Sequence, residues 1–356
     1  MSYENETRAD IKSMTLDELT EEFKANGFPA FRAKQVFAWL HKKRARSFED
    51  MTDLPASMRS GLDDKYVIHG VNIERKLVSQ LDGTVKYLYR LDDGETVEAV
   101  LMHYRHGTSL CVSTQAGCKM GCSFCASTIA GFARDLLPSE MLDEVYAAQQ
   151  DSGERVDGMV LMGIGEPLDN FDNVVKFLRM ISCEQGQNMG MRHISLSTCG
   201  LVDKIYKLME LDLQLTLSIS LHASNDERRR RLMPVARRWS IDELLRACRE
   251  YYKRTGRRIS FEYALIGGEN DGEADALELA ALLRGSGCHV NLIQVNRVEE
   301  TGYRRGTREN TERFRAVLER QGVNATIRRE LGSDINAACG QLRRESQRRG
   351  SGEVEA

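Results

Sequence analysis

The chain has 356 residues, of which 41% are hydrophobic and 29% charged, and its formal net charge is −3. This composition is typical of a soluble globular protein with one main domain and a smaller one. No apolar run approaches the roughly 18 residues that a membrane span requires, and the polar opening MSYENETRAD lacks a secretory signal core. Nine cysteines without such a signal argue against a disulfide framework, so we expect a cytoplasmic protein with metal or redox chemistry.

The N-terminal part of the sequence predicts helices. Residues 15–18, Thr-Leu-Asp-Glu, have the form of a capping box, and Leu19 and Phe23 follow at helical spacing. A second helix is predicted over residues 31–42. We therefore expect residues 1–75 to form a small helical accessory domain.

A short region with a different pattern follows. Apolar and polar residues alternate at 86–91 and at 96–100, and Asp-Asp-Gly lies between the two segments. This pattern is typical of a β-hairpin. We expect residues 76–108 to form a hairpin linker region.

From Ser109 onward, predicted strands alternate with predicted helices. The strands are expected at 109–114, 158–163, 193–198, 215–220, 259–266 and 289–296, and the helices at 139–150, 171–183, 201–211, 240–254, 273–284 and 309–321. Six βα units in a row predict a parallel sheet with helices outside it. The periodicity does not distinguish an open doubly wound sheet from a full or partial barrel. We assign residues 109–345 to this core and residues 346–356 to a disordered tail.

The strongest motif is a cluster of three cysteines, Cys118, Cys122 and Cys125, with the spacing C-x3-C-x2-C. It directly follows the first strand of the βα series. Three thiolates at this spacing can each hold one iron of a [4Fe–4S] cluster. Because no fourth cysteine follows nearby, the fourth iron would remain open for a substrate. A structural zinc site, which would need a fourth ligand close by, and three incidental buried cysteines are the alternatives.

Polar side chains recur where the predicted strands end. Active sites of βα barrels gather at the carboxyl ends of the strands, so these residues are expected on one rim. Their alternative interpretation is ordinary turn residues between strand and helix. The segments are Gly165-Glu166-Pro167, Ser197-Thr198, Ser220-Leu221-His222 and Asn296.

The cysteine spacing resembles the cluster motif of radical S-adenosylmethionine (SAM) enzymes. Longer segments resemble one family within that group, the dual-specificity 23S rRNA/tRNA adenine C2-methyltransferases, from about residue 15 to residue 345. The resemblance implies an α/β fold with a partial (βα)6-type barrel. The matching segments are LCVSTQAGCKMGCSFCAST, GIGEPLDN, HISLSTCGLV, SISLHASNDE, RLMPVARRWSIDELL, HVNLIQVN and SDINAACGQL.

The resemblance also implies the cofactors and their ligands. A [4Fe–4S] cluster would be bound by Cys118, Cys122 and Cys125, and two SAM molecules would be used per turnover. One would methylate Cys339, and the second would yield a 5′-deoxyadenosyl radical that removes hydrogen from the S-methyl group. The resulting methylene radical would add to C2 of adenine, an electron-poor carbon that does not attack a sulfonium methyl group. Expected SAM contacts are Gly165, Glu166, Ser197, Ser220, Leu221, His222 and Asn296.

Two further residues receive roles from the resemblance. Glu98 matches the proton acceptor for C2, and Cys111 would attack the sulfur of Cys339 and form a transient disulfide that releases the product. The alternative interpretations are an exposed strand residue for Glu98 and buried small hydrophobic residues for the two cysteines.

The implied substrates are adenosine 2503 of 23S rRNA and adenosine 37 of tRNAs, each of which must leave its base stack to react. The helical domain and the arginine clusters, including residues 228–231, are candidates for holding the RNA backbone. We expect a monomer that uses an electron donor such as flavodoxin or ferredoxin and does not contact a membrane. The alternatives are the sister family that methylates C8 of the same rRNA adenine, and a non-catalytic RNA-binding factor with a structural metal.

Overall fold

The computed structural model describes residues 8–129, 131–295, 302–335 and 340–350. Its strands are β1 Ala9–Asp10, β2 Tyr66–Val67, β3 Asn72–Val78, β4 Val85–Arg90, β5 Thr96–Tyr104, β6 Gly107–Cys111, β7 Gln115–Gly117, β8 Phe132–Asp135, β9 Gly158–Leu161, β10 Ile194–Thr198, β11 Thr216–Ser220, β12 Ser260–Leu265, β13 His289–Gln294 and β14 Asn324–Ile327. Its helices are α1 Leu16–Ala25, α2 Ala30–His41, α3 Ala56–Asp63, α4 Ala126–Ile129, α5 Pro138–Ser152, α6 Phe171–Ile181, α7 Val202–Glu210, α8 Asp226–Leu232, α9 Ile241–Thr255, α10 Glu273–Leu283, α11 Arg308–Arg320 and α12 Gln341–Gly350.

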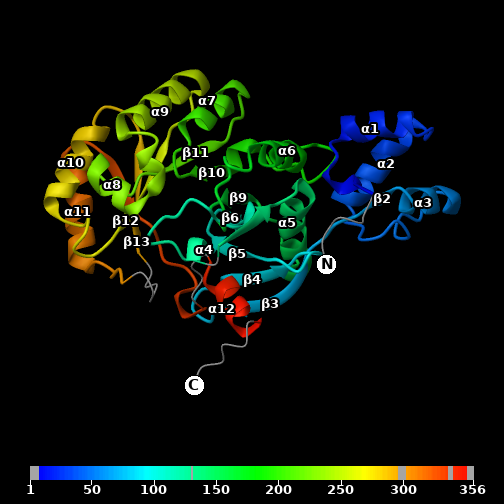
Figure 1. Cartoon of the computed structure of the whole chain (residues 1–356), viewed down its shortest axis with the longest axis horizontal. Helices are drawn as coiled ribbons and strands as arrows, with labels where there is room; N and C mark the ends of the chain where they lie inside the picture. Colours follow the sequence, from blue (N-terminus) through cyan, green and yellow to red (C-terminus); the bar gives the residue numbers. More distant parts are fainter. Residues whose placement is uncertain (1–7, 130, 296–301, 336–339, 351–356) are drawn as a thin grey trace.

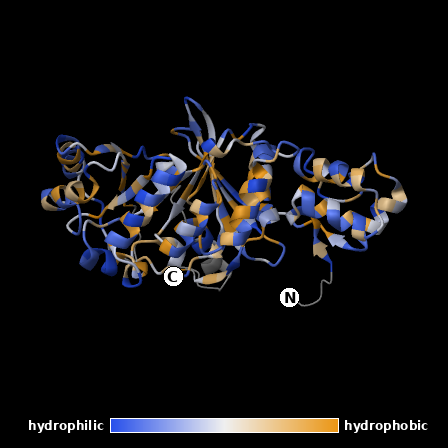
Figure 2. Ribbon diagram, turned by 90° about the horizontal axis from the view of Figure 1, so that it is seen from above, coloured by the Kyte–Doolittle hydropathy of each residue, from blue (hydrophilic) through white to orange (hydrophobic). Residues whose placement is uncertain are grey.

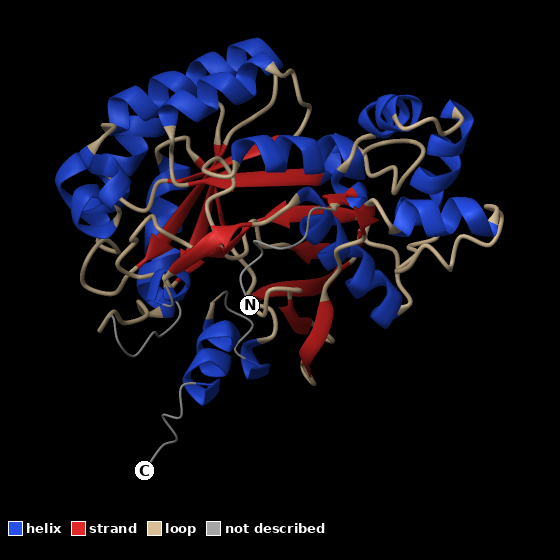
Figure 3. Ribbon diagram, turned by 45° about the vertical axis from the view of Figure 1, so that its right-hand side comes forward, coloured by secondary structure: helices blue, strands red, loops and turns tan. Residues whose placement is uncertain are grey.

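One large sheet organises the molecule, with the strand order β14-β13-β12-β11-β10-β9-β6-β5-β4-β3. Strands β6 and β9–β14 pair in parallel, and the helices between them cover the outer side of the curved sheet (Figure 3). Strands β7 and β8 form a separate antiparallel pair. Among the described residues the sheet is open, with β3 and β14 at its edges, as expected of a partial barrel. The carboxyl ends of the parallel strands therefore meet on one rim.

The predicted hairpin is confirmed as β4 and β5, which pair antiparallel. Two further pairings extend it, because β3 pairs with β4, and β5 pairs with β6, the first strand of the parallel series. We call β3–β5 the antiparallel extension. It continues the main sheet, and β3 crosses the domain boundary that the sequence analysis places at residue 75. Both faces of β4 and β5 are buried over most of their length, whereas the edge strand β3 is mostly exposed.

The predicted N-terminal helices are confirmed as α1 and α2, and the capping box of Thr15 and Glu18 is formed. Together with α3 they make a lobe at one end of the molecule (Figures 1 and 2). An ion pair between Lys12 of this lobe and Asp143 of α5 joins the lobe to the core, and their side chains are only 3% and 6% exposed. Asp143 also accepts a hydrogen bond from the Val71 amide at 2.8 Å. The lobe is therefore attached through buried polar contacts.

Asp143→Ala is expected to lower the stability of the protein by about 3–5 kcal/mol, because Lys12 would remain buried without its counter-charge. The expected result is a clear drop in the midpoint of thermal unfolding. Glu21→Ala is the control, because Glu21 pairs with Lys24 at 2.7 Å on an exposed surface and such pairs contribute about 0–1 kcal/mol. Equal midpoints for the two variants would contradict the anchoring role of this pair.

The six predicted strands and six predicted helices of the core are confirmed with small shifts at their ends, whereas β7, α4, β8, α8, β14 and α12 were not predicted. Strand β14 adds a further parallel strand beside β13. Helix α8 coincides with a run of four arginines that shows no apolar periodicity. Helix α12 continues to Gly350, inside the segment that the sequence analysis assigns to a tail. No helix in the described ranges has both the length and the apolar character that crossing a membrane would demand.

Candidate active site

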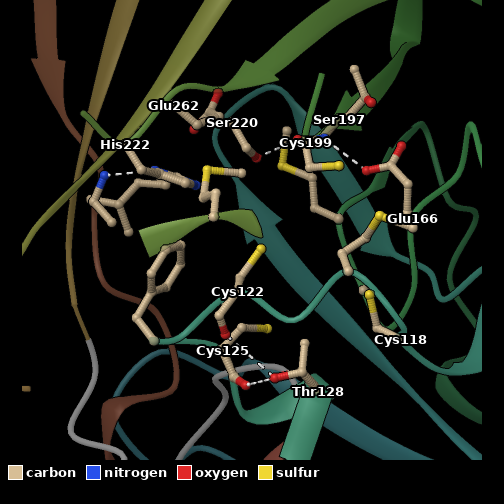
Figure 4. A pocket seen from close by; sticks show the side chains of 18 of the residues that line it. Cys118, Cys122, Cys125, Thr128, Glu166, Ser197, Cys199, Ser220, His222 and Glu262 are labelled. Carbon is tan, nitrogen blue, oxygen red and sulfur yellow. Dashed lines mark hydrogen bonds between the residues drawn. The ribbon is translucent and has the colours of Figure 1, made fainter. Parts of the chain in front are cut away.

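The three motif cysteines lie in the loop between β7 and α4 and line a cavity of about 290 Å³ at the rim of the sheet (Figure 4). The opposite walls of this cavity come from the ends of β9, β10, β11, β12 and β13. Gln341, the first residue of α12, also lines it. The strand-end residues and the cysteine motif, which are far apart in the sequence, are thus brought to one site, as the sequence predicts.

Two glycines allow the cysteine loop to take this path. Gly117 has a φ of 92°, and a Cβ at this position would overlap the carbonyl oxygen of Gly131. Gly121 has a φ of 72°. Residues that carry a side chain rarely adopt such φ angles, so both positions favour glycine. At Gly117, glycine is also required because the Gly131 backbone approaches so closely.

The thiols lie in an environment that suits a cationic cluster. Burial, together with the neighbouring charge of Cys125, raises the pKa of Cys118 to about 12. Burial also raises the pKa of Cys122, again with a contribution from Cys125. A bound cation reverses this balance, because it stabilises the thiolate form. In the described residues, no three His, Cys, Asp or Glu side chains converge on a single metal position. A cubane has a different requirement, because its three cysteine sulfurs bind three separate irons. The three thiols, which line one cavity, therefore fit the ligand set of a [4Fe–4S] cluster.

Glu166 lines the same cavity as the three cysteines, its side chain is almost fully buried, and its carboxylate is turned toward Cys199 (Figure 4). Its carboxylate accepts hydrogen bonds from the Cys199 amide at 2.7 Å and the Leu168 amide at 3.0 Å. Burial raises the pKa of this carboxyl. Gly165 precedes it with a φ of 109°, and a Cβ there would lie 2.7 Å from the side chain of Gln115. The Gly165-Glu166 segment is thus held by backbone contacts, with a buried carboxylate in the wall of the cavity that the thiols line.

The ends of β10 and β11 place hydroxyl and imidazole groups on the same wall. The hydroxyl oxygens of Ser197 and Ser220 are 3.4 Å apart. His222 has a φ of 55°, and its Nδ1 accepts a hydrogen bond from the Ala264 amide at 2.9 Å. Burial lowers the pKa of His222 to about 3, so the ring is neutral. Leu221 does not line the cavity, and its side chain is fully buried in the core. Its backbone amide donates a hydrogen bond to the Glu262 carbonyl at 3.0 Å, and its own carbonyl accepts one from Arg229.

The remaining predicted residues lie apart from the cavity wall or outside the described residues. Asn296 and Cys339 are outside the described residues. Cys111, on β6, packs beside Val100 and Met102 and is only 4% exposed. Glu98, on β5, is 2% exposed and forms an ion pair with Lys86, which excludes the alternative of an exposed strand residue.

The arginine run 228–231 is only partly available for RNA, contrary to the expectation that it forms one basic patch. Arg229 is fully buried and donates hydrogen bonds to the carbonyl oxygens of Cys199 and Leu221. Successive residues of a helix point in different directions, so a helix packed on the core buries one of four consecutive arginines. Here Arg229 is the buried arginine, and Arg230 and Arg231 remain exposed.

Several cavity residues were not predicted from the sequence, among them Cys199, Glu262 and Arg328. Glu262 is 4% exposed and accepts a hydrogen bond from the Asn291 amide nitrogen at 2.8 Å, and burial raises its pKa. The signal was present, because Glu262 is a charged residue inside an otherwise apolar strand. Cys199 and Arg328 carry no such local signal, since only the packing of β10 and β14 brings them to the cavity.

Comparisons with known proteins match both parts of the chain. Residues 112–280 match the family model of the radical SAM superfamily, and residues 9–68 match that of the ribosomal RNA large subunit methyltransferase N-terminal domain. A probable dual-specificity RNA methyltransferase RlmN from Lachnoclostridium phytofermentans is 53% identical over 95% of each chain. The corresponding protein of Alkaliphilus oremlandii is 50% identical over 95% of this chain and 98% of that one. The crystal structure of a radical SAM methyltransferase from Sphaerobacter thermophilus superposes with a TM-score of 0.88 at 41% identity, covering 94% of this chain and 98% of that one.

Proposed function

The chain belongs to the family of dual-specificity RNA methyltransferases within the radical SAM superfamily, and we propose that it methylates C2 of adenine in 23S rRNA and in tRNA through a methyl group carried on Cys339. The expected targets are adenosine 2503 and adenosine 37. One observation supports this most strongly: three thiols, a buried carboxylate and the first residue of α12 line one cavity. Cys339 lies two residues before that helix residue, Gln341, in the chain.

Cys118, Cys122 and Cys125 would hold a [4Fe–4S] cluster, and Gly165, Glu166, Ser197, Ser220, Leu221, His222 and Asn296 would bind SAM. When bound, these groups supply a methyl group and a carbon radical. The carboxylate of Glu166 suits the amino group of SAM, because a cationic partner offsets the cost of keeping this carboxylate buried and charged. The neutral His222 ring is held by the Ala264 amide and closes the cavity on the opposite side, where its edge meets the ring of Phe124.

The protein side chains would then perform the transfer. C2 of adenine lies between two ring nitrogens and is electron-poor, so it does not attack a sulfonium methyl group directly. A methyl group on Cys339 would instead be activated by hydrogen removal and joined to C2, with Glu98 accepting the C2 proton. Cys111 would then attack the Cys339 sulfur and break its bond to the new carbon, which takes up a proton and becomes the methyl group, while the two sulfurs form a disulfide. The one electron left over from the radical would return to the cluster that supplied it. Two SAM molecules would be consumed in each turnover.

The N-terminal lobe, residues 1–75, would hold the RNA, since the exposed Lys42, Lys43 and Arg46 lie on it. Residues 109–345 would form the catalytic core, with residues 76–108 between the two parts. We propose that the protein acts in the cytoplasm as a monomer and receives electrons from a donor such as flavodoxin or ferredoxin.

The test is anaerobic reconstitution with iron and sulfide, followed by reaction with SAM, a reductant and rRNA lacking the modification. We expect a brown protein and a methyl group on C2 of the target adenine, located by mass spectrometry of RNA fragments. A methyl group on C8 would instead assign the chain to the sister family that methylates C8 of the same rRNA adenine. A colourless zinc protein that leaves the RNA unmodified would refute the proposal in favour of a binding factor.

A further inference from the structure

The antiparallel extension holds the chain on both sides of residues 336–339. Before residue 336, the carboxylate of Asp334 accepts hydrogen bonds from Ser79 Oγ at 2.6 Å and from the Gln80 amide at 2.9 Å, at the turn between β3 and β4. After residue 339, helix α12 lies against β5 and α4 (Figure 1). The two segments that flank Cys339 in the chain are therefore attached to the same three strands.

The strongest of these attachments is made by Glu98 of β5. Its Oε2 accepts a hydrogen bond from the Gly340 amide at 2.8 Å, and its Oε1 accepts one from the Arg343 amide at 2.7 Å. Amides at the start of a helix have no partner within the helix, and a negative charge there interacts favourably with the helix dipole. Glu98 thus caps α12 from a strand 242 residues earlier in the chain.

The charge of this cap is balanced inside the protein. The ammonium group of Lys86 on β4 lies 3.1 Å from Glu98 Oε2, and the two side chains are 1% and 2% exposed. A buried charge is tolerated when it is paired and hydrogen-bonded, and is costly when one partner is removed. Lys86 and Glu98 therefore form one unit that holds the beginning of α12.

This unit also sets the distance between α12 and the cysteine loop. Gly340 lies directly against Ser127, two residues after Cys125, so closely that a Cβ on Gly340 would be 2.7 Å from the Ser127 amide nitrogen. The next residue, Gln341, lines the cavity. Gly340 is bonded directly to Cys339 in the chain, so its position limits the distance at which the Cys339 sulfur can lie from the cavity.

We propose that Glu98, together with Lys86, is a positioning residue that holds the start of α12 and thereby presents Cys339 to the cavity. This inference rests on the carrier role of Cys339 in the proposed function. Glu98 would then have two roles, accepting the C2 proton and positioning α12, and an experiment can separate them. Methylation of Cys339 by SAM requires the sulfur to be in place but requires no proton acceptor for the RNA.

The experiment measures methylation of Cys339 in the absence of RNA, by peptide mass spectrometry of reconstituted full-length protein incubated with SAM. Glu98→Ala is expected to slow this step about tenfold or more, because two helix amides and a buried ammonium lose their acceptor. Glu98→Gln keeps one acceptor oxygen, so its rate is expected to lie between those of Glu98→Ala and the unmodified protein. Glu74→Gln is the matched control, because Glu74 accepts a bond from Ser346 of the same helix without touching its first turn, and it should methylate normally.

Iron content and SAM binding are measured in every variant, so that loss of the site itself is recognised. Asp334→Ala removes the contacts with Ser79 and Gln80 that hold the segment before residue 336, and it should also slow Cys339 methylation. Because the side chain of Asp334 is exposed, this variant provides the test if Glu98→Ala fails to fold. Normal methylation in Glu98→Ala or in a folded Asp334→Ala, with only RNA release impaired, would overturn the positioning role. If the unmodified protein gains no methyl group on Cys339, the carrier role fails, and this inference fails with it.

Discussion

Cys111→Ala is expected to leave the RNA covalently attached to the protein and to stop turnover after the first transfer. In the proposed reaction the RNA is joined through one carbon to the sulfur of Cys339, and only attack by a second thiol on that sulfur breaks the link. Cys111 lies at the end of β6 and packs with Val100 and Met102. Leu331, which precedes Cys339 by eight residues in the chain, packs against the same cluster. Alanine is tolerated at Cys111, since it replaces a small buried side chain by a slightly smaller one.

The measurement is denaturing electrophoresis with labelled RNA, followed by mass spectrometry of the attached peptide. The double variant Cys111→Ala, Cys339→Ala is the control and should form no adduct, because the carrier sulfur is absent. Cys339→Ala alone should keep the cluster and lose all transfer. Multiple turnovers by Cys111→Ala, without a covalent species, would refute the resolving role.

Gly340→Ala is expected to reduce methylation of Cys339 by one to three orders of magnitude while leaving the cluster intact. The residue has a φ of 81°, and a Cβ there would meet the amide nitrogen and the hydroxyl oxygen of Ser127, each at 2.7 Å. A left-handed angle costs a side chain about 1–2 kcal/mol, and overpacking against backbone costs about 1–3 kcal/mol. The start of α12 must therefore move away from the cysteine loop or distort it.

The control for this variant is Gly94→Ala, in the turn between β4 and β5. Gly94 has a φ of 89°, but no atom lies within 4 Å of the position that a Cβ would take there, so an alanine introduces the backbone strain without the collision. We expect Gly94→Ala to lose some thermal stability and to keep methylation. Equal methylation in the two variants would show that the contact between Gly340 and Ser127 does not position the carrier.

Local features of the sequence predicted most of the core. The capping box at Thr15 and the strand and helix patterns of the core each depend on residues near one another in the chain, and each was confirmed. The convergence of Glu166, Ser197, Ser220 and His222 also followed, because parallel strands place their carboxyl ends on one rim. Helix α12 and strand β14 were missed because their own residues show little apolar periodicity, and contacts with distant segments stabilise them.

What the sequence determined by itself is therefore the kind of chemistry: three thiols at cluster spacing, and the polar groups that follow each strand. What only the tertiary structure decided is which charged residues are buried and what they hold. Arg229 belongs to a basic run but is sealed in the core, and Glu98 belongs to an alternating strand but caps a helix at the far end of the chain. No local pattern encodes either result, because the free energy of a buried charge depends on partners brought close only when the chain has folded.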